Sequence, residues 1–149
     1  MTINTTAIEL TQKIRSTIPL SAAMQFSIIE LNPGSILVRA PLAPNVNIHG
    51  TGFAGSLYSI AVLSGWALCT HIMAVHGMSG DLVVAKAEIK YRSPVTGDIS
   101  CCASVSEAEI RVFQTDFATL GKSRLVLNVE VGAPANAVLQ GTYAAVARE

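Results

Sequence analysis

Apolar residues that alternate with polar ones predict five or six strands in this chain. The first two strands surround Asn32-Pro33-Gly34-Ser35, because the alternation covers Met24–Ile28 before this tetrapeptide and Ile36–Ala40 after it. Proline and glycine suit the two central positions of a type II turn. Residues 24–41 are therefore expected to form a hairpin.

The same alternation returns over residues 81–92, 99–105, 125–131 and 138–147, each bounded by turn residues or by a helical pattern. In the first of these strands, one face is expected to carry the apolar residues Val83, Ala85, Ala87, Ile89 and Tyr91. The other face carries Lys86, Glu88, Lys90 and Arg92. A charged face of this kind is expected to be solvated or to lie at an interface.

Two shorter segments have the period and the end signals of helices. Thr6 and Glu9 have the spacing of a capping box ahead of apolar residues at helical spacing, and Pro19 is expected to end that helix. Ser106-Glu107-Ala108-Glu109 is a second capping box. Gly121 is expected to close the helix that follows it.

The longest apolar segment is expected to be a helix that runs from near Phe53 to Gly77. No formal charge occurs between Arg39 and Asp81, and residues 53–78 are long enough to cross a bilayer at about 1.5 Å per residue. Polar side chains interrupt the segment, and no Lys or Arg flanks it as an anchor. These polar residues are Ser56, Ser59, Ser64, Thr70, His71 and His76. We therefore expect a helix enclosed by protein and no membrane span.

The order of the elements predicts an α+β fold. A helix, two strands, a long buried helix, two strands, a short helix and two strands follow one another, and short turns between strands imply antiparallel pairing. One long apolar helix beside such a sheet is buried only if the sheet curls around it. The 149 residues suit a single domain, residues 1–149.

The composition favours an oligomer that binds neither nucleic acid nor membrane. Half of the residues are hydrophobic and only 13% are charged, so one face is expected to be buried against another subunit. Ten basic residues balance ten acidic ones, which leaves no net field for nucleic acid or an anionic membrane.

The cysteines and the beginning of the chain favour the cytoplasm. Cys69, Cys101 and Cys102 form neither a disulfide framework nor a metal-ligand spacing, and we expect no metal and no cofactor. Met1–Lys13 lack the basic and apolar regions of a secretory signal.

The segment Asn47-Ile-His-Gly-Thr-Gly-Phe-Ala-Gly-Ser-Leu-Tyr-Ser59 resembles the segment that opens the central helix of hot-dog thioesterases. Tyr91-Arg92-Ser93-Pro94 is similar to that superfamily's aromatic-x-x-Pro, and residues 121–124 and 139–144 resemble its final hairpin. A closer resemblance, through Pro41–Asn45 and Gly55–Ser59, is to the YiiD C-terminal type of thioesterase domain. The resemblance implies a hot-dog fold, with one long central helix wrapped by a curved sheet, and a homodimer or dimer of dimers.

The resemblance also implies where the chemistry occurs. Unpaired N–H groups at a helix start polarise a thioester carbonyl and stabilise the oxyanion that forms on attack. Asn47, Ala54, Gly55 and Ser56 are the expected catalytic positions, with Ala54 supplying the polarising amide and Asn47 orienting water or ligand. An Asx turn is the alternative interpretation of Asn47.

Two departures from the superfamily pattern affect the chemistry. Phe53 stands where many members have His, and Val62 stands where many carry a carboxylate that attacks or activates water. A valine does neither, so no general base is assigned. The expected function is hydrolysis of the thioester of an acyl-CoA or acyl-carrier protein. A non-catalytic acyl-thioester-binding or regulatory module is the alternative, and a dehydratase, for which only His49 fits, is the third.

A ligand with phosphates requires local positive charge on a neutral protein. The expected substrate-binding residues are Tyr58, Lys90, Arg92, Lys122 and Arg124. Tyr58 is expected near the carbonyl, and the four cations are expected to meet the phosphates of coenzyme A.

Overall fold

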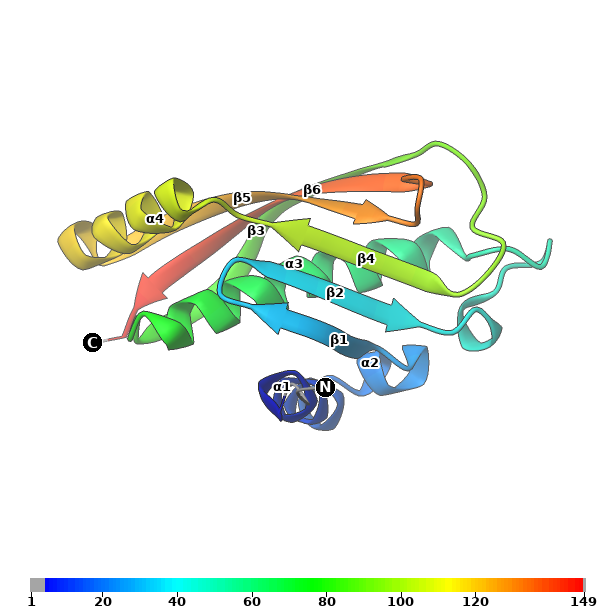
Figure 1. The fold of residues 1–149 in the computed structure, drawn as a ribbon, viewed down its shortest axis with the longest axis horizontal. Coiled ribbons are helices and arrows are strands. Elements are labelled where there is room, and N and C mark those ends of the chain that lie inside the picture. Colours follow the sequence, from blue (N-terminus) through cyan, green and yellow to red (C-terminus); the bar gives the residue numbers. More distant parts are fainter. Residues whose placement is uncertain (1–4, 149) are drawn as a thin grey trace.

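A curved six-stranded sheet wraps around one long helix in the computed structural model, which describes residues 5–148 (Figure 1). Residues 1–4, which belong to the segment inspected for a secretory signal, and residue 149 lie outside the described residues. The elements are α1 (Thr5–Thr17), α2 (Pro19–Met24), β1 (Ser27–Asn32), β2 (Ser35–Ala40), the 3₁₀ helix η1 (Ala43–Asn45), α3 (Ala54–Val75), β3 (Gly80–Tyr91), β4 (Ile99–Ser104), α4 (Glu107–Leu120), β5 (Lys122–Val131) and β6 (Ala137–Ala147).

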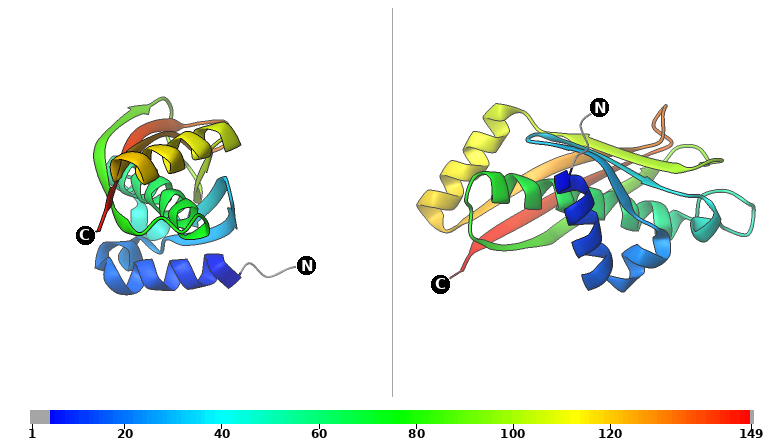
Figure 2. Two further views of the ribbon diagram at one scale, coloured as in Figure 1. Left: turned by 90° about the vertical axis from the view of Figure 1, so that its left-hand side faces the viewer. Right: turned by 60° about the horizontal axis from the view of Figure 1, so that its bottom comes forward.

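The sheet has the strand order β1-β2-β4-β5-β6-β3, and every neighbouring pair is antiparallel. Viewed along its length, the sheet curves around α3, while α1 and α2 lie beside β1 (Figure 2). Ile60, Leu68 and Ile72 of α3 are fully buried against the sheet. The predicted α+β fold is confirmed, with β1 and β3 as the two edges of the sheet.

The N-terminal elements differ from the prediction. Helix α1 is already helical at Thr5, so Thr6 lies inside its first turn and the predicted N-cap is wrong. The helix ends at Thr17, just before Pro19 as predicted, but Pro19 also begins a second helix, α2, which the sequence pattern did not predict. Proline is well suited to a first helical turn, because its missing N–H has no partner there in any case. Met24 therefore belongs to α2, and β1 begins only at Ser27.

The first hairpin forms as expected, but its turn is not of type II. Asn32 pairs with Ser35, and Gly34 does not have the positive φ that a type II turn requires. A close approach between the backbone at Gly34 and the backbone of Val105 explains the glycine instead. A Cβ on Gly34 would lie 2.9 Å from the carbonyl oxygen of Val105, whose N–H donates to the Gly34 carbonyl at 2.8 Å.

Strand β3 carries a bulge that changes which residues face the core. Its register with β6 shifts between Val84 and Lys86, and one extra residue reverses the alternation of faces. Leu82 packs against the core before the bulge, whereas Ala87 and Ile89 do so after it. Val83 is 53% exposed, so the predicted single apolar face is wrong for this half of the strand.

Predictions for the C-terminal half are confirmed. Ser106 and Glu109 form a complete capping box at α4, and Gly121 closes that helix in the left-handed conformation. The core face of β5 is buried at every second residue, from Leu125 to Val131. Cys101 is buried and Cys102 is exposed, as neighbours in a strand should be.

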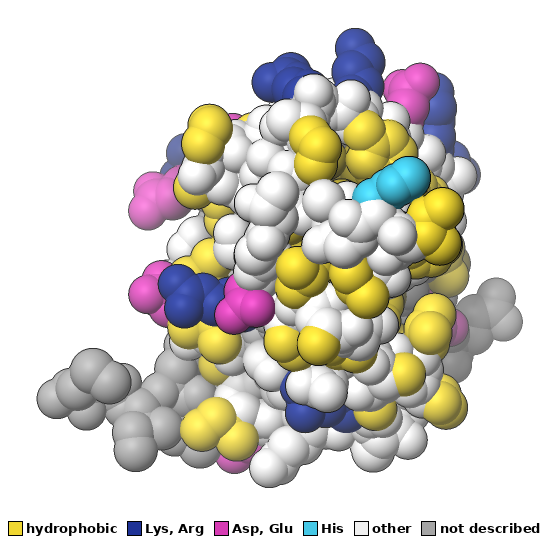
Figure 3. Space-filling model, turned by 90° about the vertical axis from the view of Figure 1, so that its right-hand side faces the viewer, with side chains coloured by type: hydrophobic (Ala, Val, Ile, Leu, Met, Phe, Trp, Pro, Cys, Tyr) yellow, Lys and Arg dark blue, Asp and Glu magenta, His cyan; other side chains and the backbone are white. Residues whose placement is uncertain are grey.

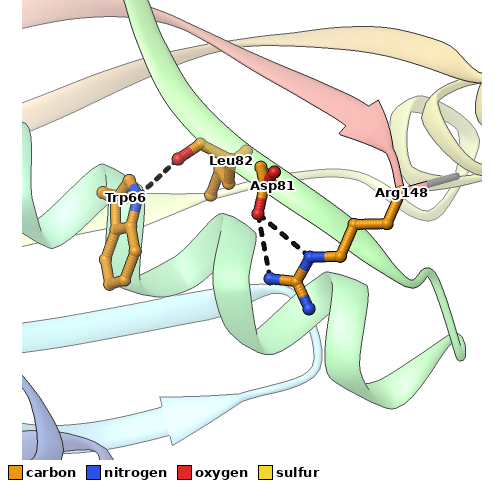
Figure 4. Close-up of polar contacts among 4 residues, drawn as sticks. All are labelled: Trp66, Asp81, Leu82 and Arg148. Carbon is orange, nitrogen blue, oxygen red and sulfur yellow. Dashed lines mark hydrogen bonds and ion pairs between the residues drawn. The ribbon is translucent and has the colours of Figure 1, made fainter.

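Side chains on α3 and on the C-terminal segment hold the start of β3 in place. The Trp66 indole N–H donates to the Leu82 carbonyl at 3.1 Å, and Arg148 forms an ion pair with Asp81 at 2.9 Å (Figure 4). By length and composition alone, α3 could cross a membrane, but half of its most apolar window is buried inside the protein. Core helices of soluble proteins pass the same test.

Candidate active site at the start of the central helix

The start of α3, together with the loop before it, forms the candidate site; we call residues 45–56 the helix opening. The N–H groups of the loop are used by the fold: Gly52 donates to Val95 O and Phe53 donates to Asn45 O, both at 2.8 Å. The helix then begins at Ala54 without a side-chain cap from Phe53. The first backbone bond into its first turn is from Leu57 N to Phe53 O. The N–H groups of Ala54, Gly55 and Ser56 therefore have no acceptor four residues before them in the helix.

Asn47 organises the loop of the helix opening. Its Oδ1 accepts hydrogen bonds from His49 N at 2.9 Å and Thr51 N at 3.0 Å. Its Nδ2 donates to Thr51 Oγ1 at 2.8 Å and, more weakly, to Gly52 O at 3.4 Å. These contacts form the Asx turn of the alternative interpretation. These contacts use the side-chain oxygen and the amide nitrogen of Asn47 within the loop. The expected role of Asn47 in orienting water or ligand stays a prediction.

Asn45 is a residue of the site that the sequence did not single out. Only 2% of it is exposed, and its Nδ2 donates to Met24 O and to Pro41 O, both at 2.9 Å. Because both donors face carbonyl oxygens, the orientation of the amide is well defined. Its Oδ1 has no hydrogen-bond partner among the described residues. Asn45 thus joins α2 and the end of β2 to the helix opening.

The last residue of β3 and the segment after that strand brace the helix opening from the other side. The Tyr91 hydroxyl donates to the Ala54 carbonyl at 2.8 Å, and the buried Val95 accepts the bond from Gly52 N. The Ala54 carbonyl and the Gly55 N–H belong to one peptide plane, so Tyr91 fixes and polarises the unit that carries a free donor. Burial, followed by the charge of Tyr58, raises the pKa of Tyr91, which keeps its hydroxyl protonated as a donor.

A pocket of about 280 Å³ lies between α2 and the helix opening; we call it the α2–α3 pocket. Asn45 lines it together with Pro44 and Ser59. Its main walls come from α2 and from the start of α3, namely Leu20, Ala23, Met24, Phe53, Gly55 and Ser56. A Cβ on Gly55 would lie 2.5 Å from the half-exposed Phe53 ring, so a larger residue here would displace that ring.

Tyr58 and Val62 lie on a different side of α3. Both are half-buried and pack against the core, and neither lines the α2–α3 pocket. The Val62 carbonyl accepts a hydrogen bond from the Tyr143 hydroxyl at 2.8 Å. The ring of Tyr143 fills the space beside Gly65, where an added Cβ would overlap the hydroxyl. Where many relatives carry a carboxylate, this chain therefore has an apolar side chain in a packed helix.

The four predicted phosphate-binding cations are not one cluster within the protein. Lys90 and Arg92 line a hollow of about 230 Å³ on the outer face of the sheet, together with Glu88 and Gln140. Lys122 and Arg124 lie on β5 opposite Val146 and Ala144 of β6, whereas Lys90 pairs with Val138. The stretch of β6 from Val138 to Ala144 separates the two pairs by roughly 20 Å at about 3.3 Å per residue. All four residues lie near strand ends in the sequence. Only the strand pairing shows that Lys90 and Arg92 lie at one end of the sheet and Lys122 and Arg124 at the other.

The end of the molecule that carries the helix opening is apolar. Ile48 is 95% exposed, and Val46 and Phe53 are about half exposed. Hydrophobic side chains spread over this end, and several Lys and Arg lie at its top rim, with others at the left side and the bottom and Asp and Glu among them (Figure 3). An apolar surface edged by cations suits a ligand with an apolar and an anionic part.

Two other kinds of chemistry find no support in the described residues. Burial raises the pKa of Cys69 and that of Cys101 to about 12, so these thiols stay protonated and do not act as thiolate nucleophiles near neutral pH. Among residues 5–148, no three His, Cys, Asp or Glu side chains are grouped to hold a metal ion.

A curved antiparallel sheet around one long helix, with free N–H groups at the start of that helix, defines a hot-dog protein of the thioesterase class. The chain belongs to the YiiD C-terminal family, described as “Putative thioesterase (yiiD_Cterm)”, which it matches over residues 7–147. Membership of this family supports a hydrolase that acts on thioesters in general.

Solved structures agree with this assignment. The chain is 31% identical to a putative thioesterase from Shewanella oneidensis, with 97% of this chain and 99% of that chain covered and a TM-score of 0.82. A protein from Chlorobaculum tepidum with unknown function has a TM-score of 0.91 at 26% identity, with 96% and 95% covered. A Pseudomonas aeruginosa protein described as a probable thioesterase has a TM-score of 0.78 at 25% identity, with 95% and 96% covered.

Proposed function

We propose that this protein hydrolyses acyl thioesters of coenzyme A or of an acyl-carrier protein to the free acid and the thiol. The observation that supports this most directly is the helix opening. The fold uses the N–H groups of Gly52 and Phe53 but leaves those of Ala54, Gly55 and Ser56 without intrahelical acceptors. A thioester carbonyl placed there would be polarised by these donors and by the positive end of α3. In this proposal Ser56 supplies a polar side chain beside the carbonyl, and Asn47 orients the water or the ligand.

We further propose that the protein acts as a homodimer, or as a dimer of dimers, in which β3 of one subunit pairs with β3 of the other. This twelve-residue strand is a sheet edge with unpaired backbone groups, and Val83 and Val84 on it are 53% and 42% exposed. A long, apolar edge of this kind is a liability unless another strand covers it. Two β3 strands paired antiparallel around a two-fold axis would bury it on both subunits.

The same pairing supports a binding site for the phosphates of coenzyme A. A two-fold axis near the middle of β3 places the Tyr91 end of one strand beside the Asp81 end of the other. Lys90 and Arg92 of one protomer would then approach the end of the partner that carries Lys122 and Arg124. The separation of these cations within one protomer is thus compatible with one site in the dimer.

Size and activity test the two parts of the proposal separately. Val84→Lys places a charge on the β3 edge and should give monomers by light scattering at micromolar concentration. Val112→Lys, on the 61% exposed Val112 of α4, should leave the dimer intact.

Wild type should release free thiol from acyl-CoA or acyl-carrier substrates. Arg92→Glu should weaken binding of acyl-CoA most at low salt.

The alternative is a module that binds acyl thioesters without hydrolysing them, and the valine at position 62 is the observation that favours it. A binder would retain thioester substrates intact in mass spectrometry of denatured protein and release no thiol. Val62→Asp supplies the carboxylate that related enzymes carry, and a gain of hydrolysis would show that the rest of the site is in place.

We also propose that the protein works in the cytoplasm. Its three cysteines are free thiols, as expected where disulfides are kept reduced.

A further inference from the structure

The α2–α3 pocket has no role in the chemistry described so far. Gly55 and Ser56, which carry free N–H groups at the start of α3, line one side of it. The opposite wall comes from α2, where Met24 is 6% exposed and Leu20 is 60% exposed. The pocket therefore leads from the proposed position of the thioester carbonyl to an apolar wall.

We propose that the α2–α3 pocket holds the acyl chain of the substrate, and that a chain gains affinity only up to medium length. This inference rests on the proposed thioester hydrolysis. With its carbonyl at the free N–H groups that begin at Ala54, a thioester can direct its acyl chain to Ala23 and Met24. Its thiol part then leaves toward the side of α3 that carries Tyr58.

The size of the pocket sets the chain length. Sites for small molecules typically occupy roughly 300–1,000 Å³, and this one measures about 280 Å³. A pocket at the lower limit of that range holds a short acyl chain but not the whole of a long one. Beyond the exposed rim at Leu20 and Phe53, a longer chain lies in water and adds no affinity.

The composition of the walls favours an apolar chain over a charged one. Leu20, Met24 and Phe53 offer apolar surface, and no Lys, Arg, Asp or Glu lines the pocket. Ser59 and the buried Asn45 add uncharged polar groups beside it. A dicarboxylic acyl group would place its second carboxylate there without a counter-ion, which is strongly unfavourable.

Steady-state hydrolysis of acetyl-, butyryl-, hexanoyl-, octanoyl- and dodecanoyl-CoA tests the pocket. For wild type, kcat/KM should rise by up to about fourfold for each methylene that enters the pocket and should stop rising by octanoyl. A continued rise through dodecanoyl-CoA would overturn the inference, because the chain would then be bound elsewhere.

A matched pair of variants on α2 locates the effect. Ala22 and Ala23 are neighbouring exposed alanines, and only Ala23 lines the pocket. Ala23→Phe should fill it and lower the ratio of hexanoyl to acetyl kcat/KM by about 10-fold or more, whereas Ala22→Phe should leave the ratio unchanged. Leu20→Ala should open the rim and change the chain length at which kcat/KM stops rising. If wild type and Ala23→Phe have the same ratio of hexanoyl to acetyl kcat/KM, the acyl chain is not bound in this pocket.

A binding measurement separates this inference from the proposed function. If wild type hydrolyses none of these thioesters, the proposed hydrolysis fails, but the pocket can still be tested with the stable thioethers S-methyl-CoA and S-hexyl-CoA. Calorimetry should show tighter binding of the hexyl compound to wild type and to Ala22→Phe, and no preference in Ala23→Phe. Equal affinity of wild type for both thioethers would overturn the inference.

Discussion

The N-termini of α3 and α4 differ in what happens to the first N–H groups of the helix, which have no acceptor within the helix itself. At α4, Ser106 accepts a hydrogen bond from Glu109 N at 3.1 Å, and the Glu109 side chain accepts one from Ser106 N at 3.3 Å. Glu107 and Glu109 place negative charge in the first turn. At α3, Phe53 supplies no side-chain cap, and the first turn has no acidic residue.

The capped N-terminus of α4 serves stability, whereas the uncapped N-terminus of α3 is available for function. The start of α4 is stabilised by its own side chains, and little of its positive end remains for a ligand. The start of α3 is instead held from outside, by Tyr91, Val95 and the two asparagines of the helix opening, so that its donors remain free. Substitutions at the two N-termini should therefore have different consequences.

The largest effect on activity is expected for Ala54→Pro. Proline fits the first helical position, and the extended backbone of Phe53, with ψ of 128°, is compatible with a following proline. The variant loses only one N–H donor, and kcat should fall about 100- to 1,000-fold while circular dichroism stays unchanged. Glu107→Pro at the corresponding position of α4 should leave kcat unaltered. An active Ala54→Pro enzyme would remove this amide from the mechanism.

Asn47→Ala should lower kcat/KM about 10- to 100-fold, because the loop before α3 loses all hydrogen bonds from this side chain. Asn47→Asp keeps the acceptor for His49 N and Thr51 N, and it should retain most of the activity if the loop geometry is what matters. Full activity in Asn47→Ala, together with full activity in Ser56→Ala, would move the reactive centre away from the helix opening.

Asn45→Ala should reduce the free energy of unfolding by about 1–3 kcal/mol, because the carbonyls of Met24 and Pro41 lose their donors in a buried place. Urea denaturation measures this loss. Asn128→Ala, which removes only an exposed and long contact with Gln140, is the matched control and should change stability little. Equal stability of the two variants would show that Asn45 does not hold the helix opening.

Tyr91→Phe should lower kcat about fivefold with little change in KM, which corresponds to one hydrogen bond of about 1 kcal/mol on the Ala54 carbonyl. The amide of Gly55, in the same peptide unit, should also shift in nitrogen–proton NMR spectra. A change in KM alone would instead indicate that the hydroxyl contacts the substrate.

The smallest effect on activity is expected at the capped helix. Ser106→Ala should cost about 1 kcal/mol of stability, because it removes the N-cap of α4. Its kcat per folded molecule should equal that of wild type. A loss of kcat at the growth temperature but not in the cold would reflect unfolding, which thermal denaturation would reveal through a lower Tm.

Elements with strong local signals could be predicted from the sequence. The capping box of α4, the alternating face of β5 and the long apolar run of α3 each depend on neighbours a few residues away, and all three are present. Local signals failed where two interpretations were close in free energy. Pro19 follows the end of one helix but also begins another, which was not predicted, and the alternation in β3 carries no mark of the bulge between Val84 and Lys86.

The sequence by itself thus determined the fold class, because hydrophobic periodicity and end signals act over short distances. It also indicated the start of α3 as the candidate site. Only the tertiary structure decided which residues surround that site. Tyr91 reaches Ala54 across 37 residues and Asn45 reaches Met24 across 21, while Lys90 and Lys122 lie at opposite ends of the sheet. Such contacts depend on strand register and sheet curvature, which arise only when distant segments pack together.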